Sequence, residues 1–134
     1  ALLKCFEDEQ VQMASLMTPV KAAEDLTNPN IVKVVCDSMS DALYFSRSPI
    51  PFDRDGSGNV PYYRHIGVYA FRYKRLLDFV ALSPGRLEQI EKLEQLRALE
   101  HGIPIRMVIT DYQGIGIDSP EDLKRVETLM ENKA

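Results

Sequence analysis

Two polar side chains share a segment that otherwise predicts a buried strand. His65 and Tyr69 are four residues apart within His65–Phe71, and the two-residue period of a strand places both on one face. Imidazole and phenol groups form hydrogen bonds with hydroxyls, so the pair could jointly donate to a polyhydroxylated ligand. The simpler interpretation of His65 alone is a core histidine with a backbone partner.

Asp118 is the first candidate for phosphate or metal chemistry. It follows a glycine-containing segment and precedes a helix that Ser119 and Pro120 predict, the position where ligands gather in open α/β sheets. Gly114 and Gly116 would let a phosphate or metal ion approach the backbone. A cation such as Mg²⁺ takes one or two carboxylates and completes its shell with water and phosphate oxygens. Alternatively, Asp118 is an ordinary turn residue before the helix cap.

More candidates lie on Leu87–His101, where apolar residues recurring every three positions predict one continuous, mostly buried helix. On this helix Glu94 lies at the edge of the apolar face, Glu91 lies just beyond that edge, and Gln95 lies on the polar side. A carboxylate beside apolar neighbours needs a partner. The alternative to a ligand role is therefore a salt bridge to Arg97, or to the histidine that ends the helix.

Arg47 begins a long stretch, residues 46–64, that is rich in proline, glycine and aspartate. Its planar guanidinium could bind a carboxylate or a phosphate with two parallel hydrogen bonds. An arginine exposed on the surface is the alternative. Stretches of this length without periodicity are usually functional lids or disordered segments.

Strands alternating with helices must position these residues, which favours an α/β fold with a mixed sheet and flanking helices. The second and third predicted strands form a hairpin. Periodicity and β-branched runs predict strands over Gln10–Pro19, Ile31–Cys36, Ala42–Ser46, His65–Phe71 and Ile103–Thr110. Helices are predicted over Arg72–Leu82 and Leu87–His101 and from Ser119 onward, and Lys21–Asp25 is predicted to be a short helix or a turn.

The composition excludes several classes of protein. The 134 residues are 45% hydrophobic and 27% charged, which excludes a fibre or a disordered tail. A net charge of −4 gives no support for nucleic-acid binding, and no apolar run reaches the roughly 20 residues of a membrane span. Two cysteines are too few for a disulfide framework, so we expect a reduced, cytoplasmic setting.

Common catalytic motifs are missing, and the start of the chain is unusual. The sequence contains no Walker A loop, no Gly-x-Gly-x-x-Gly, no Cys-x-x-Cys and no Gly-x-Ser-x-Gly. The first residues, through Phe6, resemble the last turns of a helix whose beginning is missing. We therefore expect residues 1–134 to be a single segment of a larger domain.

Five strings, in order and at matching spacing, resemble the CMP-Kdo synthetases, which are 3-deoxy-manno-octulosonate (Kdo) cytidylyltransferases. Together they extend over essentially the whole chain. The resemblance implies the C-terminal half of a Rossmann-like nucleotidyltransferase domain, the sugar-binding and dimerisation part, without the N-terminal nucleotide-binding half. The strings are Asn28–Val35, Tyr44–Phe52, His65–Tyr69, Leu87–Arg97 and Gly116–Leu123.

The resemblance also implies a reaction and roles for the candidates. Mg²⁺ neutralises the triphosphate of CTP, the anomeric hydroxyl of Kdo attacks the α-phosphorus, and pyrophosphate leaves, giving CMP-Kdo for lipopolysaccharide synthesis in a cytoplasmic homodimer. Asp118 resembles a carboxylate ligand of the metal, and with Arg47 it forms the expected catalytic pair. The residues that resemble sugar-binding positions are Arg47, His65, Tyr69, Glu94 and Gln95, with Glu91 a weaker candidate.

Two alternatives remain open at this point. A cytidylyltransferase for another sugar acid, such as a sialic acid, is the enzymatic competitor. A non-catalytic binding module of the same fold is the other, supported by the missing nucleotide loop. Because a second metal carboxylate is expected upstream, we predict that the 134 residues alone are inactive.

Overall fold

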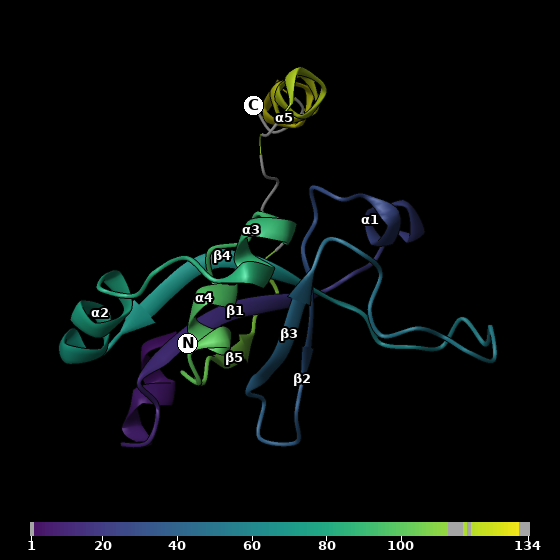
Figure 1. Ribbon diagram of the computed structural model, residues 1–134. Helices are drawn as coiled ribbons and strands as arrows, with labels where there is room; N and C mark the ends of the chain where they lie inside the picture. Colours follow the sequence, from purple (N-terminus) through teal and green to yellow (C-terminus); the bar gives the residue numbers. More distant parts are fainter. Residues whose placement is uncertain (1, 113–116, 118, 132–134) are drawn as a thin grey trace.

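A mixed sheet forms the centre of the computed structural model, which describes residues 2–112, 117 and 119–131 (Figure 1). Within the described residues the sheet has five strands in the order β3-β2-β4-β1-β5. Only the β1–β5 pair is parallel, and the other pairs are antiparallel. The strands are β1 Met13–Pro19, β2 Lys33–Cys36, β3 Ala42–Ser46, β4 Tyr63–Phe71 and β5 Arg106–Ile109. The predicted α/β class and the predicted mixed sheet are confirmed.

Short helices connect the strands, and most of them match predicted segments. The helices are η1 Leu2–Glu7, a 3₁₀ turn, and α1 Ala23–Thr27, α2 Tyr73–Val80, α3 Arg86–Glu91, α4 Leu96–Glu100 and α5 Pro120–Glu131. The Ser119 hydroxyl accepts from the backbone N–H of Asp122 at 3.2 Å, so the predicted N-cap of α5 is confirmed. None of these helices has the length and apolar character needed to cross a bilayer.

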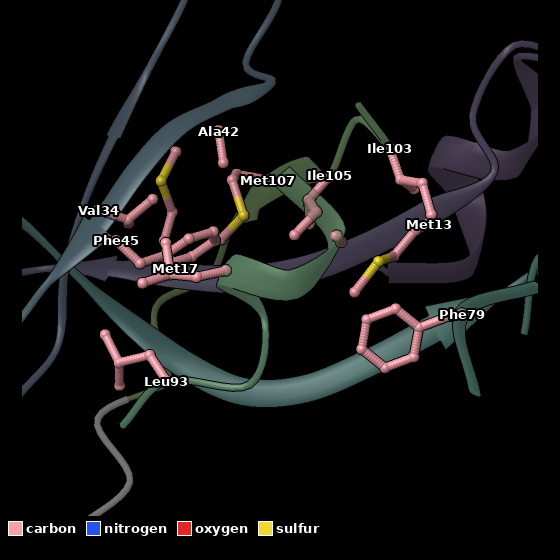
Figure 2. Packing of buried hydrophobic residues seen from close by; sticks show 12 residues of the cluster. Met13, Met17, Val34, Ala42, Phe45, Phe79, Leu93, Ile103, Ile105 and Met107 are labelled. Atoms are coloured by element: carbon pink, nitrogen blue, oxygen red, sulfur yellow. The ribbon is translucent and has the colours of Figure 1, made fainter. Parts of the chain in front are cut away.

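The apolar residues of the sheet gather against α4. Figure 2 shows Met17 of β1, Phe45 of β3, Ile105 and Met107 facing one another beside this helix. Strand β4 occupies the middle of the sheet, as its apolar sequence predicts. The predicted burial of this strand is wrong, because none of its residues is buried and Val68 is 50% exposed. Burial of this cluster is the main source of stability, because each large apolar side chain removed from water contributes about 1.5–3 kcal/mol.

The prediction of one continuous helix over Leu87–His101 is wrong. The backbone of Lys92 is left-handed (φ 55°, ψ 47°) and ends α3, and α4 begins four residues later at Leu96. The expected burial is also wrong for the first half, since Ile90 is 66% exposed while Leu96 is fully buried. A regular three-residue repeat therefore extends over two helices with different surroundings.

Contacts between the N-terminal end of α3 and side chains of α4 accompany the break. The carboxylate of Glu100 accepts from the backbone N–H groups of Leu87 (2.8 Å) and Glu88 (3.2 Å), whereas a straight helix would separate these residues by about 20 Å. Arg97 also bonds to the Glu88 carboxylate through two nitrogens, at 2.9 and 2.6 Å. The chain folds back so that the Glu100 side chain accepts from N–H groups in the first turn of α3, which have no partner within the helix. The Arg97 side chain binds the Glu88 carboxylate beside them.

Candidate functional site

A cavity of about 790 Å³ lies on the side of β4 that carries His65 and Tyr69. The loop before β2, the turn between α3 and α4, and α5 complete its walls. Its volume is in the range typical of small-molecule sites. Three of the residues predicted from the sequence line it together: His65, Tyr69 and Gln95.

A bulge in β4 brings two of these side chains together. Ser15 of β1 pairs with Tyr69, but the next residue, Leu16, pairs with Ile66, so β4 contains two extra residues at this point. The ring centroids of His65 and Tyr69 are consequently 5.5 Å apart, whereas positions i and i+4 of a regular strand are separated by about 13 Å. The expectation that they share a face is confirmed, and the bulge makes them neighbours.

The turn between α3 and α4 brings the third side chain to this pair. The amide nitrogen of Gln95 lies 3.4 Å from Nδ1 of His65, and Gln95 is buried. On the other side of the ring, the Ser15 hydroxyl lies 2.8 Å from Nε2, and Phe45 contacts the ring edge-on at 4.9 Å. His65 is therefore held from three directions.

The imidazole of His65 and the phenol of Tyr69 are both uncharged at physiological pH. Burial lowers the pKa of His65 to about 4, so the imidazole is neutral at physiological pH. Burial, with a smaller contribution from the charge of Glu94, raises the pKa of Tyr69, so its phenol stays protonated. The part of the cavity wall formed by His65 and Tyr69 thus offers neutral hydrogen-bonding groups, which suit hydroxyls better than anions.

Arg47 has a role that the sequence did not suggest. Its guanidinium donates to three backbone carbonyls, those of Glu91 (2.7 Å), Pro29 (2.8 Å) and Lys92 (3.2 Å). In a continuous helix two of these carbonyls would accept from residues four positions later. Arg47 instead terminates α3 and fastens it to the loop before β2, and it does not line the cavity. The hydrogen bonds that the sequence predicts from Arg47 to a ligand carboxylate or phosphate stay a prediction.

Glu91 is likewise used within the fold. Its carboxylate accepts from the Ser46 hydroxyl at 2.7 Å and from the backbone N–H of Arg47 at 2.9 Å. The Tyr44 hydroxyl lies 3.5 Å away, and burial together with the Glu91 charge raises the pKa of Tyr44. Glu91 joins α3 to the end of β3 and lies outside the cavity lining.

Glu94 is exposed, with 69% of its side chain accessible, and lies 3.9 Å from a guanidinium nitrogen of Arg97. The salt bridge considered from the sequence is therefore present, although Arg97 bonds more closely to Glu88. Exposed pairs of this kind contribute little to stability. Glu94 remains close enough to Tyr69 for its charge to affect the phenol.

The predicted metal ligand, Asp118, lies outside the described residues, as do Gly114 and Gly116. Within residues 2–112, 117 and 119–131, no group of three or more histidine, cysteine, aspartate and glutamate side chains could hold a metal ion. Two carboxylates of the described residues, Asp25 and Asp122, line the cavity.

Several residues that line the cavity were not selected from the sequence. The Asn28-Pro29-Asn30 string was interpreted only as a turn, although its two amide side chains are good hydrogen-bonding groups. The cations were overlooked because nothing in their local patterns distinguishes them from surface residues. The overlooked lining residues are Lys21, Asn28, Asn30, Arg64, Tyr112 and Arg125.

Comparison with known proteins identifies the family. Residues 1–109 match the family described as cytidylyltransferase. The chain belongs to the cytidylyltransferase family. This confirms the resemblance to cytidylyltransferases that the five strings indicated.

Two curated relatives of this cytidylyltransferase chain carry the same name. It is 51% identical over 132 residues to the 3-deoxy-manno-octulosonate cytidylyltransferase of Christiangramia forsetii, covering 96% of the chain and 53% of the relative. Its identity to the enzyme of that name from Solibacter usitatus is 47% over 129 residues, covering 96% and 51%. The chain spans about half the length of the curated relatives it matches.

A solved structure has the same fold. This is the CMP:2-keto-3-deoxy-manno-octonic acid synthetase complexed with CTP, which superposes with a TM-score of 0.87 at 40% sequence identity. The match covers 99% of the present chain and 55% of that protein. The mixed α/β sheet described above is therefore a nucleotidyltransferase fold.

Proposed function

We propose that the protein containing this chain transfers CMP from CTP to Kdo, giving CMP-Kdo and pyrophosphate for lipopolysaccharide synthesis. In this reaction the anomeric hydroxyl oxygen forms a bond to the α-phosphorus, the bond from that phosphorus to the bridging oxygen breaks, and the hydroxyl proton is released. The cluster of His65, Tyr69 and Gln95 in one cavity is the observation that carries the proposal. It supplies neutral partners for sugar hydroxyls, and the relatives named above are Kdo enzymes.

The charges around the cavity complement a sugar acid. Three cations, Lys21, Arg64 and Arg125, line it with two carboxylates, Asp25 and Asp122, and the excess of one positive charge favours a carboxylate or a phosphate. In the proposal His65, Tyr69 and Gln95 hold the hydroxyls, and such positioning contributes much of the rate of a displacement between two bound substrates. Arg47 and Glu91 support this wall by fixing α3 and the loop before β2. Glu94 contributes negative charge at its rim.

Cytidylyltransferases of this family generally use a divalent metal, and we propose Mg²⁺ with Asp118 as one of its carboxylates. When bound, such an ion would neutralise charge on the triphosphate. The resemblance of Gly116–Leu123 to the family supports Asp118 in this role. The proposed contacts of His65, Tyr69 and Gln95 with the sugar hydroxyls do not depend on the metal.

We further propose that residues 1–134 form the sugar-binding and dimer-forming part of a cytoplasmic homodimer. The exposed apolar side chains Met39 (65%), Leu43 (62%) and Val68 (50%), on the hairpin and on β4, support self-association. Free cysteines at positions 5 and 36 fit a reducing compartment. Sedimentation of the purified protein at micromolar concentration tests the dimer.

A coupled pyrophosphate-release assay with CTP and Mg²⁺ tests the reaction. The protein containing this chain is expected to turn over Kdo and not a sialic acid, and the product is checked as CMP-Kdo. Replacing His65 with Ala is expected to raise the KM for Kdo about tenfold, the equivalent of one lost hydrogen bond, and to leave the KM for CTP unchanged. Turnover of the sialic acid, or no turnover of either acid, would contradict the proposal.

A further inference from the structure

The bulge in β4 leaves backbone carbonyls that the sheet does not use. Gly67 and Val68 have no partner on β1, because Ser15 pairs with Tyr69 and Leu16 pairs with Ile66. A carbonyl that loses its ladder partner takes another donor, from a side chain or from water. The hydroxyl of Ser15, a fully buried residue, lies 2.9 Å from the Val68 carbonyl oxygen and 3.2 Å from that of Ile66.

The same hydroxyl determines which nitrogen of His65 carries the proton. A carbonyl can only accept, so the single hydroxyl proton of Ser15 is directed to the carbonyls of the bulge. A lone pair of the oxygen then faces Nε2 of His65 at 2.8 Å, and this contact is a hydrogen bond only if Nε2 is protonated. The neutral ring has one proton, which leaves Nδ1 bare on the side of Gln95, whose amide nitrogen lies 3.4 Å away.

We propose that Ser15 is a positioning residue that fixes His65 in its Nε2–H tautomer and turns the bare Nδ1 toward the cavity. His65 then accepts a hydrogen bond from a ligand or from Gln95, and Tyr69 supplies the donor. The consequence for ligand binding rests on the proposed function, whereas the tautomer itself does not. The sequence predicted that both His65 and Tyr69 donate hydrogen bonds to a ligand. In this proposal Tyr69 donates and His65 accepts.

Nitrogen NMR of the protein with ¹⁵N-labelled histidine tests the tautomer directly, because protonated and bare ring nitrogens resonate far apart. The chain contains two histidines, and His101 provides an internal reference of opposite pattern. Its Nδ1 lies 2.8 Å from the carbonyl of Arg97, so that nitrogen donates. Spectra of His65→Gln and His101→Gln assign the two rings.

The expected wild-type spectrum shows a protonated Nε2 and a bare Nδ1 for His65 above pH 6. In Ser15→Ala the two ring shifts of His65 move toward each other as both tautomers become populated, and those of His101 stay unchanged. Ser15→Thr retains a hydroxyl and restores the wild-type pattern. Ser46→Ala is the matched control, since it removes another buried strand hydroxyl, one that bonds to Glu91, and is expected to leave the His65 shifts in place.

A protonated Nδ1 in wild-type His65 would overturn the proposal, and so would a Ser15→Ala spectrum that retains the pure Nε2–H pattern. The wild-type spectrum decides even if Ser15→Ala does not fold. Steady-state kinetics separate this proposal from the proposed function. Ser15→Ala is expected to raise the KM for Kdo by about threefold to tenfold with kcat and the KM for CTP within about twofold. A changed tautomer with unchanged KM would remove His65 from Kdo binding and leave the role of Ser15 standing.

Discussion

Glu91 and Glu94 show how differently two residues of one type behave three positions apart. Both were candidate ligand residues by type and spacing, and the fold separates them. The Glu91 carboxylate accepts from the Ser46 hydroxyl and the Arg47 backbone, whereas the Glu94 carboxylate is largely exposed beside Arg97. At the scale of the residue, burial and partners determine the role.

Replacing Glu91 with Ala is expected to lower the free energy of unfolding by about 2 kcal/mol, since it leaves two donors without their acceptor. Glu94→Ala is the control and is expected to change it by less than about 0.5 kcal/mol. Urea denaturation followed by circular dichroism measures both. Equal effects of the two substitutions would show that Glu91 does not join α3 to β3 as described.

His65 gives the protein a pH dependence of known sign. Its pKa is lowered to about 4 in the folded state and is about 6.5 when unfolded, so the unfolded chain binds the proton first as the pH falls. The contribution of the neutral imidazole to the free energy of unfolding is fully present above pH 6.5 and decreases as the pH falls toward 4. Between pH 7 and 5 we expect a loss of about 2 kcal/mol.

Denaturation midpoints measured across this pH range check the expectation. His65→Gln is expected to show a flatter profile, because the titrating group is gone. His101→Gln, a substitution at an exposed position, serves as the control and keeps the profile of the wild type. An unaltered slope in His65→Gln would indicate that the imidazole is not held neutral by burial.

At the scale of the element, the α3–α4 corner decides the shape of the site. Lys92 adopts a left-handed backbone, Glu100 supplies acceptors for the N-terminus of α3, and Arg47 donates to carbonyls at its C-terminus. The corner places Gln95 against His65. One straight helix could not satisfy both ends of α3 and deliver Gln95 to the cavity.

Lys92→Gly is expected to stabilise the protein by about 1 kcal/mol, because glycine adopts positive φ without the steric cost that a side chain incurs. Lys124→Gly is a matched control of opposite sign, since Lys124 is exposed in the interior of α5 and glycine inside a helix costs about 1 kcal/mol. Chemical denaturation measures both changes. Destabilisation by Lys92→Gly would contradict the left-handed turn at this position.

Strand positions were more predictable than helix continuity. The β-branched run Ile31–Cys36 contains β2, and the alternation in Gln10–Pro19 contains β1, since these patterns are local. The site was predictable in part: strand parity placed His65 and Tyr69 on one face. Their 5.5 Å approach was not predictable, because it requires a bulge that depends on pairing with β1.

At the scale of the whole molecule, the cavity is assembled from distant parts of the chain. Its walls come from the loop before β2, from β4, from the corner that holds Gln95 and from α5. The relatives that the chain matches are about twice as long. In the proposed function, this chain therefore provides the sugar side of a larger site.

A preparation of the 134 residues alone is expected to release no detectable pyrophosphate from CTP and Kdo. The physical reason is that an Mg²⁺ site with only part of its carboxylates binds the ion weakly. The coupled pyrophosphate-release assay measures release, with the 3-deoxy-manno-octulosonate cytidylyltransferase of Christiangramia forsetii as the positive control. Normal turnover by the 134 residues would show that they contain every group the reaction needs.

The sequence by itself determined the strands, the cap that opens α5 and the family, because these depend on neighbouring residues and on ordered motifs. Only the tertiary structure decided that Arg47 terminates a helix, that Glu91 joins α3 to β3, and that Ser15 contacts His65. These contacts connect residues 44 and 50 positions apart. Local periodicity contains no information about such partners, and a buried polar group takes its role from whichever partner the fold brings to it.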